Sequence, residues 1–454
     1  MEQLQQQTGN EIQIDFEDDD VRIGVDLAGY STYTKTRSPV NYGRYSFIST
    51  KKASLVFNRR SEIIKVRGEW QGKLEWLKRS EGNDWVYYST GGYSGSYETF
   101  VMPSVSKNVS FRIPTPYNEV FKCLGEHYLP NLPYDTNAII GSDPFQDSTV
   151  QDLIDGWPAI VGAVCSKSDS YPETIRRFLV KAAGNTPERL LAKSQELIRI
   201  NGGRITVLPP DTRHVDYNVI PLPISRGCLY KCRFCRVKDK SPFSPASDEA
   251  IANRLHGLRN HYGEDLSNYN SVFLGDHDGL ACPDNFILNC ADSAITQLLL
   301  DQSYMKGSAI FLFGSVHSLL AKEESFFKAL NDLNCLTFIN IGLESADQET
   351  LNYIGKPLTS QQVRQAFHRM QDINLRFPRI ECTGNFVMDR KLPSNHYPSL
   401  LELVRDNVPE RRNKGTIYLS PLCLSRPSSR DMFEFCQLKS SSRLPMYLYL
   451  IQRL

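Results

Sequence analysis

The feature that most constrains the fold is a regular alternation of strand and helix patterns between residues 219 and 420. Short apolar runs predict strands over residues 219–224, 271–274, 309–313, 337–343, 380–388 and 416–419. The stretches between them predict helices over residues 248–262, 284–300, 322–333, 346–354, 360–373 and 397–407. Such alternation is typical of parallel strands covered by helices. Because six units rather than eight fit here, we expect an α/β fold with a partial (β/α)6 barrel. Its chemistry should lie at the carboxyl ends of the strands.

The residues before this barrel differ from it in composition and in the periodicity of their apolar residues. Runs rich in β-branched and aromatic residues, separated by glycines, predict a β-meander with strands over residues 53–58, 62–67, 73–78 and 84–89. Two helices are expected over 172–183 and 187–200, the second with Thr186 as its N-cap. We therefore predict a disordered acidic tail (1–20), an N-terminal α+β domain (21–210), the barrel (211–425) and a C-terminal extension (426–454). The extension should contain a final strand over residues 444–451 that adds to the sheet.

Charge and hydropathy limit the partners and the compartment. The net charge is +1, so no global field draws the chain to nucleic acid or to an anionic membrane. No apolar stretch approaches the roughly 18 residues of a spanning helix, so no membrane insertion is expected. The first twenty residues hold seven acids and no base, which is unlike a secretory signal. We expect a cytoplasmic protein, with nucleic acid neither excluded nor favoured as a partner.

The strongest chemical motif follows the first predicted strand. Cys228, Cys232 and Cys235 are spaced C-x3-C-x2-C, with the aromatic residue Phe234 just before the third cysteine. Three thiolates in eight residues can hold a [4Fe–4S] cluster and leave its fourth iron without a protein ligand. A zinc site and a plain electron-transfer cluster are the alternatives. Each would want a fourth ligand, and no further Cys or His lies in the loop.

This cysteine spacing, placed between a strand and a series of βα units, resembles the signature of the radical S-adenosylmethionine superfamily. The resemblance implies a [4Fe–4S] cluster bound by Cys228, Cys232 and Cys235, with S-adenosylmethionine bound to the open iron. It also implies a flavodoxin- or ferredoxin-like electron donor, and it places Phe234 near the adenine of the cofactor.

Two later segments carry further parts of the resemblance. After the second strand the superfamily often has a Gly-Gly-Glu-like segment whose backbone binds the amino group of S-adenosylmethionine, and here Gly275 and Asp276 stand in that place. The adjoining His277 and Asp278 are either polar substrate contacts or solvated turn residues.

After the fourth strand, the sequence Gly-Leu-Glu-Ser resembles the branch with tRNA methylthiotransferases, the elongator catalytic subunit and coproporphyrinogen dehydrogenases. In that branch Glu344 and Lys356 would lie near the methionine and ribose of the cofactor. Part of this segment has a simpler interpretation, since Ser345 and Gln348 match a helix capping box and Gly355 a helix stop.

Other polar and sulfur-containing residues have weaker assignments. Alternation along the fifth strand puts Glu381, Thr383 and Asn385 on one face, and they would line the substrate cavity if that face points inward. Cys423 and Cys436 follow the sixth strand, where a thiol can donate a hydrogen atom to a substrate radical. For them, and for the six other cysteines outside the loop, a buried structural thiol is the simpler role. We expect no disulfides and no cobalamin.

Three functional hypotheses follow from these motifs. The first is a radical S-adenosylmethionine enzyme, an oxidoreductase or transferase, that acts on an unknown small-molecule, lipid or peptide substrate. The second is a tRNA-modifying enzyme of the same superfamily. The third is a non-catalytic iron–sulfur or zinc protein whose β-rich half binds a partner.

Overall fold

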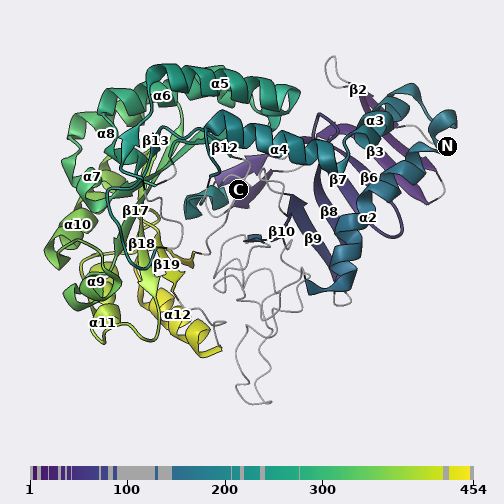
Figure 1. Cartoon of the computed structure of the whole chain (residues 1–454). Helices are drawn as coiled ribbons and strands as arrows, with labels where there is room; N and C mark the ends of the chain where they lie inside the picture. The colour runs from purple at the N-terminus through teal and green to yellow at the C-terminus, as the bar shows by residue number, and fades with distance from the viewer. Residues whose placement is uncertain are drawn as a thin grey trace, which may run out of the picture.

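The structure is a computed structural model, and it describes most of the chain. The described residues are 4–7, 12–18, 20–28, 32–35, 38–41, 43–70, 73–79, 85–88, 128–130, 146–205, 207–214, 219–235, 241–275, 277–422 and 429–449. Figure 1 shows two bodies side by side, a helix-covered sheet built from the second half of the chain and a second sheet built from the first residues. No helix within the described ranges is long and apolar enough to cross a bilayer.

The second half of the chain forms a seven-stranded sheet in which every neighbouring pair is parallel. In spatial order its strands are β12 (Ile220–Pro221), β15 (Ser271–Phe273), β16 (Ala309–Ser315), β17 (Leu336–Glu344), β18 (Ile380–Met388), β19 (Ile417–Pro421) and β20 (Met446–Leu448). All nine residues of β18 are buried, as expected for a strand covered on both faces. The predicted α/β class and parallel barrel are confirmed, and β20 pairs with β19 as the predicted final strand.

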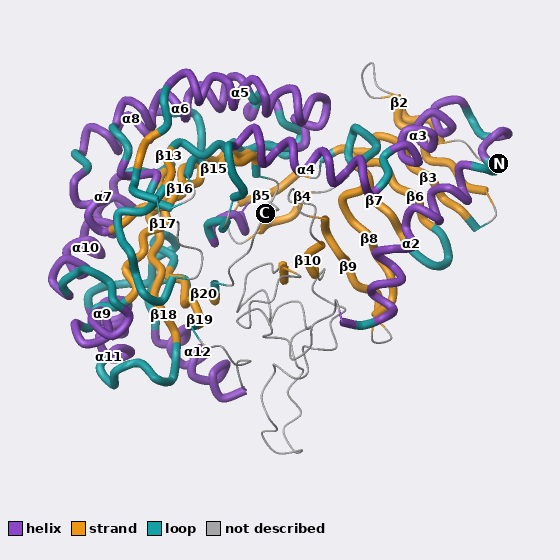
Figure 2. Tube along the Cα trace, in the orientation of Figure 1, coloured by secondary structure: helices purple, strands orange, loops and turns teal. Residues whose placement is uncertain are grey.

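Helices cover the outside of this sheet, as Figure 2 shows. They are α5 (Asp248–Tyr262), α6 (Asp284–Gln297), α7 (Val316–Ala321), α8 (Glu324–Asp332), α9 (Gln348–Ile354), α10 (Ser360–Arg376), α11 (His396–Leu401) and α12 (Ser429–Ser441). Local sequence fixes several ends: Ser247 caps α5, and Thr359 forms a capping box with Gln362 at the start of α10. Through Phe367 and Met370, both fully buried, α10 contributes to the core beside β18.

A segment that precedes the first strand forms a core with the inner face of this sheet. Val207 and Leu208 belong to one buried cluster with Phe311 and Tyr418 from β16 and β19. The 3-10 turn η5 (Pro210–His214) follows, and its Asp211 is fully buried. Tyr418 Oη and Thr383 Oγ1 donate to the Asp211 carboxylate at 2.7 and 2.8 Å. These contacts fill the space that an open barrel would leave.

The three polar residues that were predicted to share one face of β18 lie in two different environments. Thr383 and Asn385 point to this interior, where Asn340 of β17 donates to Thr383 Oγ1 at 2.9 Å and bonds the Asn385 amide. Glu381 Oε1 instead accepts from Gly415 N at 3.1 Å and from Thr416 Oγ1 at 2.9 Å in the loop before β19.

The first half of the chain forms a nine-stranded antiparallel sheet. Its order is β1 (Leu4–Gln7), β2 (Ile12–Asp18), β3 (Val21–Ala28), β6 (Arg44–Ser49), β7 (Ser54–Phe57), β8 (Ile63–Trp70), β9 (Lys73–Arg79), β10 (Trp85–Tyr88) and β11 (Tyr128–Pro130), with β4 (Thr32–Lys35) and β5 (Ser38–Asn41) as a separate ribbon. Strands β7 to β10 match the predicted meander. Helices α2 (Ser148–Cys165) and α3 (Glu173–Gly184) pack on this sheet, where Phe57 meets Phe178 edge to face at 5.3 Å. Helix α4 (Pro187–Asn201) has the predicted Thr186 N-cap.

The prediction of a disordered tail over residues 1–20 is wrong where the structure describes those residues. Strand β2 pairs with β3, and its Ile14 and Phe16 are buried. The alternation of Ile14 and Phe16 with acidic residues gives β2 one apolar face, which outweighs its acidic composition. One of those acids is also neutralised, because Arg22 Nε donates to Asp15 Oδ1 at 2.9 Å across the pair.

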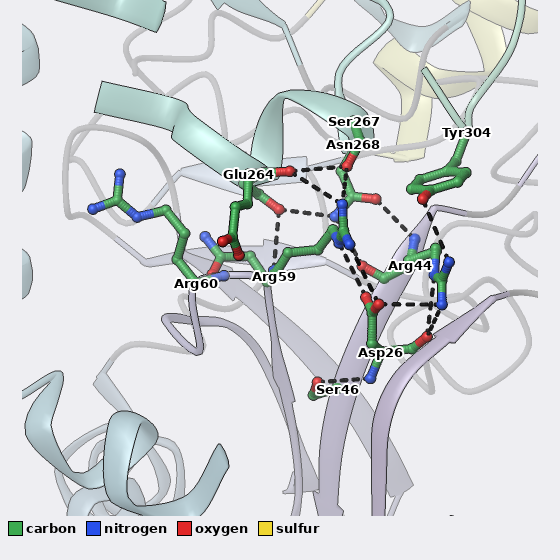
Figure 3. Close-up of polar contacts among 11 residues, drawn as sticks. Asp26, Arg44, Ser46, Arg59, Arg60, Glu264, Ser267, Asn268 and Tyr304 are labelled. Atoms are coloured by element: carbon green, nitrogen blue, oxygen red, sulfur yellow. Dashed lines mark hydrogen bonds and ion pairs between the residues drawn. The ribbon is translucent and has the colours of Figure 1, made fainter. Parts of the chain in front are cut away.

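Polar contacts fix this sheet to the barrel, as Figure 3 shows. Asp26 of β3 accepts from Arg59 Nε at 3.1 Å and forms an ion pair with Arg44 Nη2 at 3.1 Å. Asn268, at the end of η6 (Gly263–Asn268) on the barrel, exchanges two 2.8 Å hydrogen bonds with the backbone of Arg44. The guanidinium of Arg44 also lies over the ring of Tyr304, 5.2 Å from its centroid. The two halves therefore share a built interface.

Candidate cluster and cofactor site

The three cysteines lie in the loop that follows β12, at the carboxyl end of the parallel sheet. A short ribbon closes the base of this loop, because β13 (Ser225–Arg226) pairs with β14 (Ser244–Pro245). Gly227 has φ +70°, and a Cβ there would collide with the backbone of Pro242, so glycine is required where the chain turns. Cys232 is buried, and Cys228 and Cys235 are half-buried.

Electrostatic coupling places the cysteines beside two of the predicted cofactor residues. Burial is the main reason that the pKa of the Cys232 thiol is raised to about 11. Lys356 lowers that pKa, whereas Glu344 and the two other cysteines of the loop raise it. These five groups therefore share one local field. Within the described ranges, no group of three His, Cys, Asp or Glu side chains lies close enough together to bind a single metal ion. Cluster cysteines each bind a different iron, so they need not converge on one point.

Glu344 and Lys356 form an ion pair at the end of β17. Their Oε1 and Nζ atoms are 3.2 Å apart, and both side chains are at most 10% exposed. Glu344 has φ +64° at a break in the strand register, and Gly355 has φ +68° where it ends α9. Lys356 follows that turn and points back toward the sheet. Gly342 leaves room for the pair, since a Cβ there would lie 2.7 Å from Glu344 Oε1.

The Lys356 ammonium group is held in its charged form. Burial alone would lower the pKa of Lys356, but Glu344 first and Cys232 next outweigh it, and the pKa is raised. Nζ also lies 4.9 Å from the centroid of the Tyr230 ring, a cation–π contact. A buried, fixed cation next to three thiols is suited to balance the negative charge of metal-bound thiolates.

Two further polar groups, Tyr230 and Asp278, lie at this carboxyl end of the barrel, which we call its mouth. Tyr230, inside the cysteine loop, shares a 2.6 Å hydrogen bond with His317 Nδ1 at the start of α7. Asp278 Oδ1 accepts from Ser318 Oγ at 2.8 Å and from Ser315 N at 3.1 Å. Its second oxygen is buried and has no hydrogen-bond partner among the described residues. Burial raises the pKa of Asp278. An orphaned buried carboxylate oxygen near Lys356 is what a site for a polar ligand leaves when only the protein is present.

The other residues predicted to bind the cofactor are Gly275, Phe234 and Asp276. Gly275 lies in the turn after β15, where a Cβ would come within 3.0 Å of Gly279 Cα, so the glycine permits this tight turn. Phe234 is half-buried and packs against the main core. Asp276 lies outside the described residues. Sequence reasoning missed Tyr230, His317 and Ser315, although the position of Ser315 at the end of β16 would have marked it by the rule for parallel sheets.

The predicted capping box at Ser345 is wrong. The N-cap of α9 is Asp347, whose carboxylate accepts from Thr350 N at 2.9 Å. Ser345 instead donates to His396 Nδ1 at 2.8 Å, while His396 Nε2 donates to Val387 O at 2.9 Å. This buried bridge ties the residue after Glu344 to β18. No local pattern marks His396, because its pairing with Ser345 joins residues far apart in the chain.

The other cysteines are structural in their surroundings. Cys282, Cys290, Cys335 and Cys382 are buried, and burial raises the pKa of each thiol. Cys436 differs, since α12 leaves it exposed. Cys423, the second thiol considered for hydrogen donation, and Cys123 lie outside the described residues.

The fold and the site together define a parallel α/β barrel with a cysteine loop at the carboxyl end of its first strand. Residues 222–404 match the family model of the radical S-adenosylmethionine superfamily, so this part of the chain is a radical S-adenosylmethionine domain. The domain indicates an enzyme and implies a [4Fe–4S] cluster and S-adenosylmethionine as its cofactors. The residues present fit that chemistry: three soft thiol donors stand in one loop, beside a buried cation and an unsatisfied carboxylate oxygen.

Solved structures resemble the chain only distantly. The cobalamin-dependent S-adenosylmethionine radical enzyme OxsB has 17% identity and a TM-score of 0.32, with coverage of 50% of this chain and 31% of OxsB. A radical SAM methyltransferase from Sphaerobacter thermophilus has 12% identity and a TM-score of 0.34, with coverage of 51% of this chain and 65% of that one. Streptococcus suis SuiB has 12% identity and a TM-score of 0.31, with 62% and 61% covered. This chain thus spans about a third of OxsB. No curated protein matches it in sequence.

Proposed function

We propose that the chain is a radical S-adenosylmethionine enzyme in which Cys228, Cys232 and Cys235 each bind one iron of a [4Fe–4S] cluster. S-adenosylmethionine would bind at the iron that has no protein ligand. When bound, the cluster and S-adenosylmethionine would supply one-electron reductive cleavage of the C5′–sulfur bond, with the electron taken from the donor protein, and hydrogen abstraction from the substrate. The observation that carries the proposal is the joint position of the three thiols and the Glu344–Lys356 pair at one mouth of the barrel.

The protein side chains then have separate tasks. Lys356 would balance the negative charge of the thiolates, and Lys356 and Glu344 would bind the methionine and ribose of the cofactor. The turn at Gly275 would receive the methionine amino group, and Phe234 would pack near the adenine. Tyr230 holds the cysteine loop against α7 through His317. All of them orient the cofactor and exclude water, since the cofactor supplies the reactivity.

The substrate class is a narrower proposal. Near-neutral charge favours a small molecule, lipid or peptide over nucleic acid. The runner-up is tRNA, on the likeness of the Gly-Leu-Glu-Ser segment to tRNA methylthiotransferases, and a strongly salt-dependent affinity for tRNA would favour it. We propose a flavodoxin- or ferredoxin-like protein as the electron donor.

The direct test is to reconstitute the full chain anaerobically with iron and sulfide, reduce it with dithionite, and quantify 5′-deoxyadenosine by chromatography. We expect 5′-deoxyadenosine from the wild type and none from a Cys228→Ala/Cys232→Ala/Cys235→Ala variant. Cys165→Ala, on α2 of the N-terminal half, is the matched control and should retain full activity. Product from the triple variant would refute the assignment. Metal analysis separates the third hypothesis, because a zinc protein would hold zinc and release no 5′-deoxyadenosine.

A further inference from the structure

A groove outside the barrel mouth lies between α4, from the N-terminal half, and α5, from the barrel. Its volume is about 720 Å³, within the range of small-molecule sites. The two helices run alongside each other in Figure 1 and are in direct contact. The charged lining is mostly basic: Arg60, Lys193, Arg199 and Arg254 line the groove against one acid, Glu196. This excess contrasts with a net charge of only +1 for the whole chain.

Part of that charge is neutralised within the protein. Arg199 Nε donates to Glu196 at 2.8 Å, and both Lys193 and Arg60 pair with Glu62. These pairs leave one net positive charge at Lys193 and Arg60, which share Glu62, and another at the end of the groove at Arg254.

At that end Gly202, the C-cap of α4, and Arg254 line the groove, and Arg226 lies beside Gly202 without lining it. The Nη2 atoms of Arg226 and Arg254 both lie within 3.5 Å of the point where a Cβ of residue 202 would be. Arg226 donates to Gly202 O, and Arg254 donates to Pro223 O. Within the described ranges neither guanidinium has a carboxylate partner in an ion pair. Burial first and Arg226 next lower the pKa of Arg254, so the two like charges oppose each other.

A purely structural role accounts for this arrangement only in part. One neutral donor at each position would satisfy the two carbonyl oxygens without charge repulsion. Each guanidinium carries five N–H donors in a fixed fork, and each contact described here uses one nitrogen of that fork. Two such forks side by side match the oxygens of a phosphate group.

We propose that this groove binds a small molecule that carries a phosphate group, with the phosphate held at the end of the groove by Arg254, which lines it, and by Arg226 beside it. The rest of the ligand lies along α4 and α5, past Asn253 and His256. RNA is less suited, because the lining contains no Phe, Tyr or Trp on which bases would stack. The site is separate from the cofactor site, although Arg226 is two residues from Cys228. The proposal does not depend on the proposed function.

The test is isothermal titration of the purified full chain with inorganic pyrophosphate in phosphate-free buffer. We expect saturable binding by the wild type, and about tenfold weaker binding or more for Arg226→Gln and for Arg254→Gln. Arg364→Gln, which removes a guanidinium paired with Glu402 elsewhere on the surface, should bind like the wild type. Arg254→Lys keeps the positive charge and one donor to Pro223 O but removes the planar set of guanidinium donors. It therefore tests whether those donors bind the phosphate if Arg254→Gln fails to fold.

Two results would overturn the proposal. One is the absence of saturable pyrophosphate binding by folded wild-type protein. The other is equal affinity in the wild type, Arg226→Gln and Arg254→Lys. If pyrophosphate does not bind while tRNA binds with a steep salt dependence that Arg226→Gln abolishes, the groove serves RNA and the small-ligand assignment fails.

Discussion

The Glu344–Lys356 pair offers the sharpest test of the site's electrostatics. Both side chains are at most 10% exposed, and their charged atoms are 3.2 Å apart. Lys356→Met removes the cation and leaves a buried carboxylate without its partner, a change that typically destabilises a protein by about 3–5 kcal/mol. Glu344→Gln should cost less, because Lys356 keeps the Tyr230 ring at 4.9 Å, and a desolvated cation–π contact is worth roughly 2 kcal/mol.

The measurement is urea unfolding of the protein without cofactor, followed by far-ultraviolet circular dichroism. Tryptophan fluorescence would miss the barrel, since all four tryptophans precede residue 160. The double variant Glu344→Gln/Lys356→Met should lose less stability than the sum of the single variants, because no unpaired charge remains. The reasoning is refuted if Lys356→Met unfolds at the wild-type urea concentration, or if the two losses add.

Three further predictions concern residues outside the cysteine loop. Burial alone would raise the pKa of Glu62, but Lys193 and then Asn58 hold it below its usual range. The resulting stabilisation is present above the ordinary carboxyl pKa and is lost as the pH falls through the depressed one. Glu62→Gln should therefore flatten the acid limb of a thermal-melting profile. Gly355→Ala, at φ +68° and against the Arg233 side chain, should lower stability by about 1 kcal/mol or more, measured by urea unfolding. Thr186→Ala removes the α4 N-cap and should cost about 1 kcal/mol by tryptophan-monitored unfolding.

The parts of this molecule that were predictable depend on local patterns. The βα alternation gave the six strands and the main covering helices, since hydrophobic periodicity and caps are encoded within a few residues. Thr186 and Gly355 were identified as a helix start and stop for the same reason. The cysteine spacing identified the loop because three thiols in eight residues have few other uses.

The parts that were missed depend on contacts between distant residues. His396 meets Ser345 across 51 positions, and Asp211 meets Tyr418 across 207. Neither pair leaves a local pattern in the sequence. Strand β2 was not predicted for a different reason. The acidic composition of residues 1–20 obscures the alternation of Ile14 and Phe16 with acids.

The buried network around Asp211 also limits where a ligand can enter the barrel. Phe311, Phe338 and Tyr418 pack in one buried cluster with Ile205, Val207 and Leu208. Asp211 is bonded to Thr383 and Tyr418 beside them. A substrate therefore has no room at that level of the barrel. At the carboxyl end, the unsatisfied Asp278 oxygen and Lys356 offer polar groups that a ligand can contact. We infer that the substrate enters from that end. Thr383→Val, which removes one donor to Asp211, should then lower stability in urea unfolding while the KM for S-adenosylmethionine stays unchanged. A raised KM with unchanged stability would place Thr383 in the ligand site and refute this view of the interior.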